Sequence, residues 1–157
     1  MENTLKKILL CVDTESHNLR AQELALSLAE KFQAKLVCLY VVDAYPKHFT
    51  NEIYAINREE CRRYLDESLT REGLQILENL KMLALRKGIP IEIKLRYGLP
   101  KEEILKELKA DNYDLLIMGK KKYKGYLDRI RSFNLPKRLF EDISIPVLFA
   151  VSEEYGK

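Results

Sequence analysis

Short apolar runs alternate along this chain with longer stretches in which apolar residues recur every three or four positions. The first two runs are KILLCVD (Lys7 to Asp13) and KLVCLYVVD (Lys35 to Asp43), and two more follow at 113–119 (YDLLIMG) and 145–151 (IPVLFAV). Nearly continuous apolar runs are typical of strands that are covered on both faces. Because parallel strands need crossover connections, the alternation predicts a parallel sheet joined by helices.

The stretches between the runs predict the helices. Apolar residues recur at helical spacing over 19–32, after a Ser16 that can act as N-cap. The long charged stretch at 44–87 begins with a loop and continues as an apolar helical stripe. Gly73 lies inside that stripe at a cost of about 1 kcal/mol relative to Ala, so we expect a kink or two helices there. Two shorter helices are predicted at 99–110, with Pro100 near its start, and at about 134–143.

The segment IEIKLRY at 91–97 alternates apolar and polar residues, which predicts a strand exposed on one face and nearer a sheet edge. With it, the chain has five strands in one α/β domain spanning residues 1–157: an open five-stranded parallel sheet with helices on both faces. Ligands of such sheets bind beyond the carboxyl ends of the strands, where the winding direction reverses. Those ends carry Asp13, Asp43, Gly98 and Gly119.

Charge is unevenly distributed. The net charge is only +3, but residues 119–138 hold five Lys and three Arg against one Asp, which gives +7 and leaves −4 for the rest. Any anion-binding role is therefore local. No apolar run is long enough for a signal peptide or a membrane span, so we expect a cytoplasmic protein without membrane contact.

Reactive side chains do not favour an enzyme. The three cysteines, Cys11, Cys38 and Cys61, have no metal-ligand spacing, and their odd number argues against a disulfide framework. His17 and His48, the two histidines, belong to no nucleophile-base or metal pattern, and the chain has no Walker or GxSxG motif. No catalytic or metal-binding residue is predicted.

Five segments, KILLCVDTES, KLVCLYVVD, YGLPKEEIL, YDLLIMG and ISIPVLFAV, together resemble the universal stress protein family in their order and spacing, across nearly the whole chain. The resemblance implies a Rossmann-like fold of the adenine nucleotide alpha hydrolase type and a role in the stress response. It also implies a homodimer formed through the last strand, Val147 to Val151.

In the nucleotide-binding branch of that family, the fourth strand is followed by G-x2-G-x9-G-[ST], whose glycines let backbone amides approach the phosphates of ATP. Counted from Gly119, this motif expects glycines at 122 and 132 and a hydroxyl residue at 133, but the chain has Lys122, Ser132 and Phe133. Counting back from IPVL shifts the last pair to Phe133 and Asn134, and neither register restores the motif. A side chain at 122 occupies space that glycine leaves to the phosphate.

The resemblance also implies where a nucleotide would bind. Asp13 would contact the nucleoside, the backbone of Val41 would meet adenine, and Met118 with Gly119 would lie beside the ribose and phosphates. The remaining candidates for nucleotide binding are Lys120, Lys122, Ser132 and Asn134. Taken without the resemblance, Asp13 is equally well explained as a cap, and Val41 and Met118 are more simply core residues.

The basic segment at 119–138 fits three interpretations: a solvated surface loop, a phosphate-binding loop with altered chemistry, or a contact for nucleic acid or an acidic protein. Solvation is the simplest, and nucleic acid is the least favoured. We therefore predict a dimeric stress-response binding or signalling protein with nucleotide binding weakened or lost. The alternatives are a slowly hydrolysing protein that binds ATP with Mg²⁺ through its lysines, which bind phosphate as point charges, and a nucleic-acid-associated protein.

Overall fold

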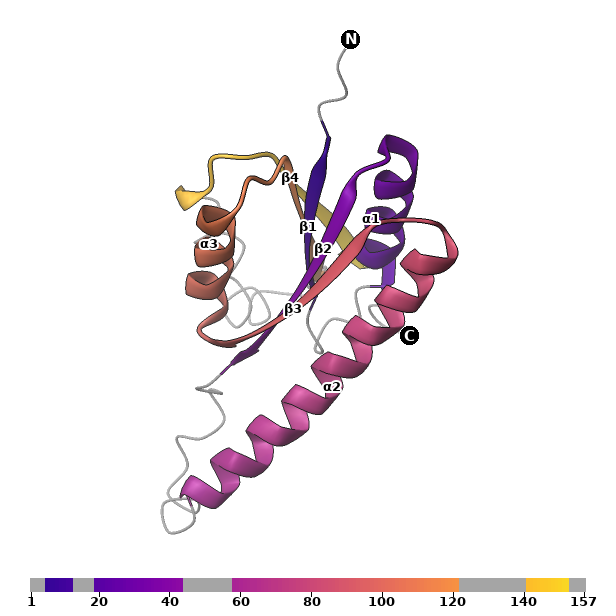
Figure 1. Ribbon diagram of the computed structural model, residues 1–157. Coiled ribbons are helices and arrows are strands. Elements are labelled where there is room, and N and C mark those ends of the chain that lie inside the picture. The colour runs from indigo at the N-terminus through magenta and orange to yellow at the C-terminus, as the bar shows by residue number, and fades with distance from the viewer. Residues whose placement is uncertain (1–4, 13–18, 44–57, 122–140, 153–157) are drawn as a thin grey trace.

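The computed structural model describes residues 5–12, 19–43, 58–121 and 141–152. Five parallel strands form one sheet in the order β3-β2-β1-β4-β5, as Figure 1 shows. The strands are β1 (Lys7–Val12), β2 (Lys35–Asp43), β3 (Ile91–Gly98), β4 (Leu115–Lys121) and β5 (Val147–Ser152). The helices are α1 (Leu19–Phe32), α2 (Arg58–Arg86) and α3 (Pro100–Ala110). The predicted open five-stranded parallel sheet is confirmed.

Helices cover both faces of the sheet, as predicted: α1 and α2 lie on one side and α3 on the other (Figure 1). Alternate strand residues point to opposite faces, so each face has its own core. The core under α1 and α2 includes Ile8, Leu10, Leu36 and Ile117, and the core under α3 includes Leu9, Val37, Ile104 and Leu116. Apart from their first residues, Lys7 and Lys35, and the last residue of β2, Asp43, strands β1 and β2 are apolar, as expected of strands buried on both faces.

The order of the strands fixes where the winding direction changes. From β1 the chain proceeds outward to β2 and β3, and α3 then carries it back across the sheet to β4 and β5 on the other side of β1. The direction therefore reverses between β1 and β4. In sheets of this kind the crevice beyond the carboxyl ends of the strands at that reversal is where ligands bind.

The predicted interruption at Gly73 is wrong. Helix α2 is one continuous element of 29 residues from Arg58 to Arg86. A Cβ atom at Gly73 would overlap the ring of Tyr40, with Cγ of that ring only 2.8 Å away. The glycine therefore does not end the helix; it lets the aromatic ring of β2 pack directly against the helix backbone.

Strand β3 is an edge strand, as its alternating pattern predicts, and β5 forms the opposite edge. The expectation that the polar face of β3 is exposed is wrong, because Glu92, Lys94 and Arg96 are only partly exposed and Lys94 and Arg96 form ion pairs with α3. Pro100 begins α3, as predicted. Of the helix predicted at 134–143, residues 141 and 142 are helical, and 134–140 lie outside the described residues, as does Ser16.

Candidate functional site

The carboxyl end of β1 is flanked by two of the predicted site residues. Val12, the last residue of β1, pairs with the residue before Val41 in β2. On the other side, Cys11 pairs with Met118, the residue before Gly119 in β4. The register therefore brings Val41 and Gly119 to either side of the end of β1. This is the point at which the winding direction reverses.

The side chains of Met118 and Val41 belong to the core under α3. Met118 is buried in it, and Val41 is half-buried and packs against it. These positions fit the interpretation of Val41 and Met118 as core residues. At the carboxyl end of the strands, Val41 and the half-buried Gly119 therefore expose mainly backbone. Lys120 continues β4 opposite Val151. Four of the predicted nucleotide-binding residues, Asp13, Lys122, Ser132 and Asn134, lie outside the described residues.

Strand β4 does not end at Gly119. It remains paired with β5 for two more residues, Lys120 with Val151 and Lys121 with Ser152. Successive N–H groups of an extended strand point to opposite sides. A phosphate nest needs successive N–H groups that converge on one anion, which a turn provides and a strand does not. Residues 119–121 therefore do not form such a nest.

A polar cluster that sequence reasoning missed lies on the α3 side of β3; we call Glu107, Lys94, Arg96 and Tyr113 the Glu107 cluster. The carboxylate of Glu107 is fully buried and accepts four hydrogen bonds. Lys94 Nζ donates at 2.8 Å and the Tyr113 hydroxyl at 2.6 Å to Oε2, while Arg96 donates from Nη2 at 2.7 Å and from Nε at 3.2 Å to Oε1. Both oxygens are thus fully bonded.

Hydrogen bonds to the charged form decide the protonation state of Glu107. Burial alone would raise the pKa of its carboxyl, but the bonds from Lys94, Tyr113 and Arg96 together hold that pKa below its ordinary value. Burial and the bond to this carboxylate raise the pKa of Tyr113. Glu107 is thus a carboxylate and Tyr113 a neutral phenol at physiological pH. Neither is poised to transfer a proton, so the cluster ties α3 to the sheet.

The carboxyl end of β3 holds a second polar contact with α3. Gly98 has a φ of 149°, and a Cβ atom there would lie 2.8 Å from Oε2 of Glu103. Glu103 in turn pairs with Arg96 at 3.6 Å and with Lys106 at 2.9 Å. Asp43 pairs with Gly98 in the register, so both predicted strand ends lie at this edge. They lie on the β2 and β3 side of β1, whereas the reversal lies on its β4 side.

Thiols and metal ligands offer no reactive centre in the described part of the chain. Cys11 and Cys38 are buried and free, and burial raises the pKa of both thiols, that of Cys38 to about 12. Among the described residues, no group of three or more His, Cys, Asp or Glu side chains is placed to hold a metal ion. Neither histidine lies among them. None of the described helices is long and apolar enough to span a membrane.

These features define the class of the protein as a doubly wound α/β domain whose winding direction reverses between β1 and β4. The sequence model of the Universal stress protein family matches residues 4–150, and the chain belongs to that family. A universal stress protein of Methanocaldococcus jannaschii is 29% identical over 147 residues, covering 94% of this chain and 82% of the relative. One of Bacillus subtilis is 30% identical over 132 residues, covering 76% and 81%.

Solved structures share the fold. A universal stress protein of Lactobacillus plantarum superimposes with a TM-score of 0.73 at 18% identity, covering 92% of this chain and 96% of that one. A universal stress protein in complex with cAMP has a TM-score of 0.64 at 19% identity, covering 95% and 98%. One from Archaeoglobus fulgidus in complex with dAMP has a TM-score of 0.60 at 14% identity, covering 93% and 98%.

Proposed function

We propose that the protein is a cytoplasmic, dimeric stress-response binding protein whose affinity for adenine nucleotides is weakened or lost. The observation that carries this proposal is the extended course of β4 through Lys121, paired with β5, at the place where the family's phosphate-binding loop begins. The sequence adds to it, because Lys122 follows where the motif has its second glycine. Both features work against an anion nest of backbone amides.

Nucleotide binding through lysines is the second candidate. Two relatives of the same fold hold cAMP and dAMP, and the backbone of Val41 and Gly119 lies at the edge in this chain as the resemblance requires. Lys120 and Lys121 follow directly, and lysine binds phosphate as a point charge without imposing a geometry. Such binding would depend strongly on salt, whereas a nucleoside pocket would not.

Titration calorimetry of the nucleotide-stripped protein with ATP and Mg²⁺ separates the two candidates. We expect little heat at near-physiological salt, with any dissociation constant weaker than about 1 mM, because the backbone contacts to the phosphates are missing. Weak binding seen only at low salt would reflect the screened lysine charges. Saturable one-site binding at about micromolar strength, still present at the higher salt, would overturn the proposal.

Restoring the motif provides the matched control for that titration. The triple variant Lys122→Gly, Ser132→Gly, Phe133→Ser restores the motif counted from Gly119, and Lys120→Gly, Tyr123→Gly, Phe133→Gly, Asn134→Ser restores it counted back from IPVL. We expect at least one of them to bind MgATP about tenfold or more tightly than the wild type, which corresponds to about 1.4 kcal/mol. Equal affinity in all three proteins would show that the loop sequence does not limit binding.

The edge strand β5 supports the dimer. The N–H of Leu116 donates to the carbonyl of Pro146, so in this parallel ladder Pro146 and the alternate residues after it direct their backbone groups to β4. The backbone groups of Val147, Phe149 and Val151 point away from β4, where the Val151 carbonyl accepts a hydrogen bond from Arg20 Nη1 at 3.4 Å, and the Val151 side chain is exposed. An apolar open edge of this kind invites pairing with a second copy.

Replacing Val151 with Pro removes one outward N–H without touching the ladder to β4. We expect this variant to have a lower average mass than the wild type in analytical ultracentrifugation, because the β5 edge can no longer pair fully. Val151→Ala, which keeps the N–H, is expected to sediment like the wild type. A wild-type protein found only as an 18.4 kDa species at micromolar concentration would contradict the dimer.

A further inference from the structure

The second edge of the sheet is β3, beyond which no further strand pairs among the described residues. The N–H of Leu36 donates to the carbonyl of Pro90, and Leu36 pairs with Ile91. In a parallel ladder this directs the backbone groups of Pro90 and of the alternate residues after it to β2. The backbone groups of the remaining residues point away from the sheet; these are Ile91, Ile93, Leu95 and Tyr97. This edge is distinct from the β5 edge and lies on the opposite side of the domain.

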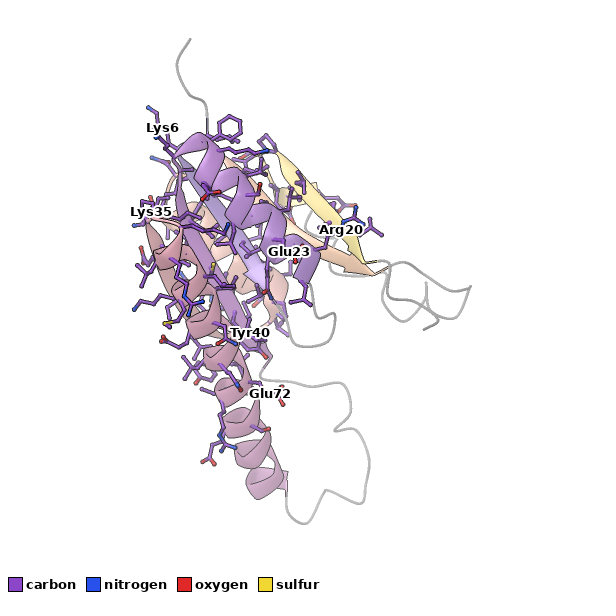
Figure 2. All side chains as sticks on the ribbon, turned by 90° about the vertical axis from the view of Figure 1, so that its right-hand side faces the viewer. Lys6, Arg20, Glu23, Lys35, Tyr40 and Glu72 are labelled. Carbon is purple, nitrogen blue, oxygen red and sulfur yellow. The ribbon has the colours of Figure 1, made fainter. Side chains whose placement is uncertain are left out.

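Helix α2 runs beside this edge, antiparallel to β3 (Figure 1). It lies over the boundary between the two outer strands, because Gly73 contacts the ring of Tyr40 in β2 and the Thr70 hydroxyl lies 2.9 Å from the hydroxyl of Tyr97 in β3. In Figure 2, Tyr40 and Glu72 mark the region where β2 meets α2. Thr70 therefore identifies the side of α2 that faces the β3 edge.

A stripe of exposed residues continues along that side of the helix. At 3.6 residues per turn, positions three and four apart lie one above another. Counted from Thr70, these positions are Leu74, Glu78, Lys81 and Leu85. All four are exposed, Leu74 by 41% and Leu85 by 60%. We call these four residues the α2 stripe. It has one apolar residue at each end and one charge of each sign between them.

The α2 stripe is complementary to itself. If a second α2 lies antiparallel with its midpoint at the same place, between Asn79 and Leu80, then Leu74 of each copy faces Leu85 of the other. In the same arrangement Glu78 of each copy faces Lys81 of the other. Both contacts form twice, so the pairing is isologous.

Strand β3 is complementary to itself about Ile93. In an antiparallel pairing of two β3 strands centred there, Ile91 lies opposite Leu95 on the face under α2. On the other face Glu92 lies opposite Lys94, again twice. The residues that pair through hydrogen bonds, including Ile93 with itself, are those whose backbone groups point outward.

One two-fold axis satisfies both pairings. Thr70 is level with Tyr97, and the midpoint of the stripe is about 14 Å further along the helix at 1.5 Å per residue. Along β3, which rises about 3.3 Å per residue, the same distance of about 14 Å corresponds to about four residues. Counted back from Tyr97, this reaches Ile93. The two-fold axis would lie midway between β3 and its copy, and a helix over the β2–β3 boundary lies about 5 Å to the side of that axis. The two α2 helices would therefore be about 10 Å apart, an ordinary packing distance.

We propose that a second copy of this chain docks on the β3 edge and the α2 stripe, antiparallel and related by a two-fold axis, so that the sheet continues through β3 into its copy. This interface goes beyond the proposed function, since it uses the edge opposite to β5. An isologous contact at each edge links copies into a longer assembly, which one edge alone does not.

Disulfide trapping tests the geometry. Leu74→Cys and Leu85→Cys are made separately in a Cys61→Ser, Val151→Pro background, which removes one native thiol and blocks the β5 edge; Cys11 and Cys38 stay buried. Under mild oxidation we expect the 1:1 mixture to form covalent dimers, because position 74 faces position 85. Each variant alone is expected to form several-fold fewer, since like positions lie about 16 Å apart along the helices. No dimer in the mixture, or equal yields in all three samples, overturns the proposal.

A charge exchange tests the same contact without cysteines. In the Val151→Pro background, Glu78→Lys places Lys against Lys and Lys81→Glu places Glu against Glu, so each is expected to weaken self-association tenfold or more in ultracentrifugation. The double variant restores both pairs and is expected to return to within threefold of the parent. A double variant as weak as either single variant overturns the proposal. Neither experiment involves nucleotide or the β5 contact, so their outcome is independent of the proposed function.

Discussion

Replacing Glu107 with Ala lowers the free energy of unfolding by about 2–3 kcal/mol, because it leaves two cations and a phenol without their common acceptor. Removing one partner of a fully buried pair costs more, but Lys94 and Arg96 are partly exposed and recover some hydration. For a domain of this size the loss corresponds to a melting temperature about 5–10 °C lower. Thermal and denaturant unfolding at neutral pH measure it.

The Glu107 cluster also predicts how stability depends on pH. A carboxylate whose pKa is lowered by folding stabilises the protein fully above its ordinary pKa of 4.5, and that stabilisation is lost as the pH falls through the folded value. Glu92, whose pKa is lowered chiefly by its bond to Lys35, acts in the same direction. Glu107→Gln is less stable at pH 7, but it loses less stability than the wild type on acidification below pH 4.5.

Lys106→Ala is the control for this pair of variants. Lys106 is 63% exposed and forms an ion pair with Glu103 three residues earlier in the same helix. Glu103 is buried but keeps its ion pair with Arg96 at 3.6 Å, so removing the exposed ammonium should lower the free energy of unfolding by less than about 1 kcal/mol. If Glu107→Ala lowers the free energy of unfolding no more than Lys106→Ala does, the buried carboxylate does not hold α3 on the sheet.

Strand β1 could be predicted from the sequence because its residues form an uninterrupted apolar run. Every residue of the β1 segment ILLCV is buried, so no polar residue interrupts the run. The alternation in IEIKLRY correctly placed β3 at an edge, although residues 91–96 are partly buried on both of its faces. The two extra residues of β4 could not be predicted, because Lys120 and Lys121 look like loop residues until β5 pairs with them.

The polar contacts were beyond sequence reasoning because they join distant segments. Charged residues on a short helix look solvated, and nothing in the helix 100–110 alone shows that Glu107 meets Lys94 and Arg96 of β3. The available signal is the alternate charges of β3 followed by acids at 103 and 107, one helical turn apart. Of the candidate site residues, the strand register locates Val41, Met118, Gly119 and the backbone of Lys120 at the carboxyl ends of β2 and β4. The role of Asp13 stays a prediction.

Gly73→Ala is expected to destabilise the protein by about 1–3 kcal/mol, although the same change in an exposed helix would stabilise it by about 1 kcal/mol. The reversal in sign comes from Tyr40, whose ring occupies the space that a Cβ at position 73 needs. The ring belongs to a buried side chain of β2 and cannot turn into solvent, so either the helix or the strand must shift. Denaturant unfolding with an unchanged slope measures the loss directly.

A double-mutant cycle identifies the ring as the cause. Tyr40→Leu alone is destabilising because it leaves a cavity, but in that background Gly73→Ala no longer meets the ring and should cost little or become stabilising. The coupling between the two positions is then at least about 1 kcal/mol and favourable to the double variant. If Gly73→Ala costs the same in both backgrounds, the glycine serves some purpose other than admitting the ring. A stabilising effect in the wild type would show that α2 does not press against Tyr40.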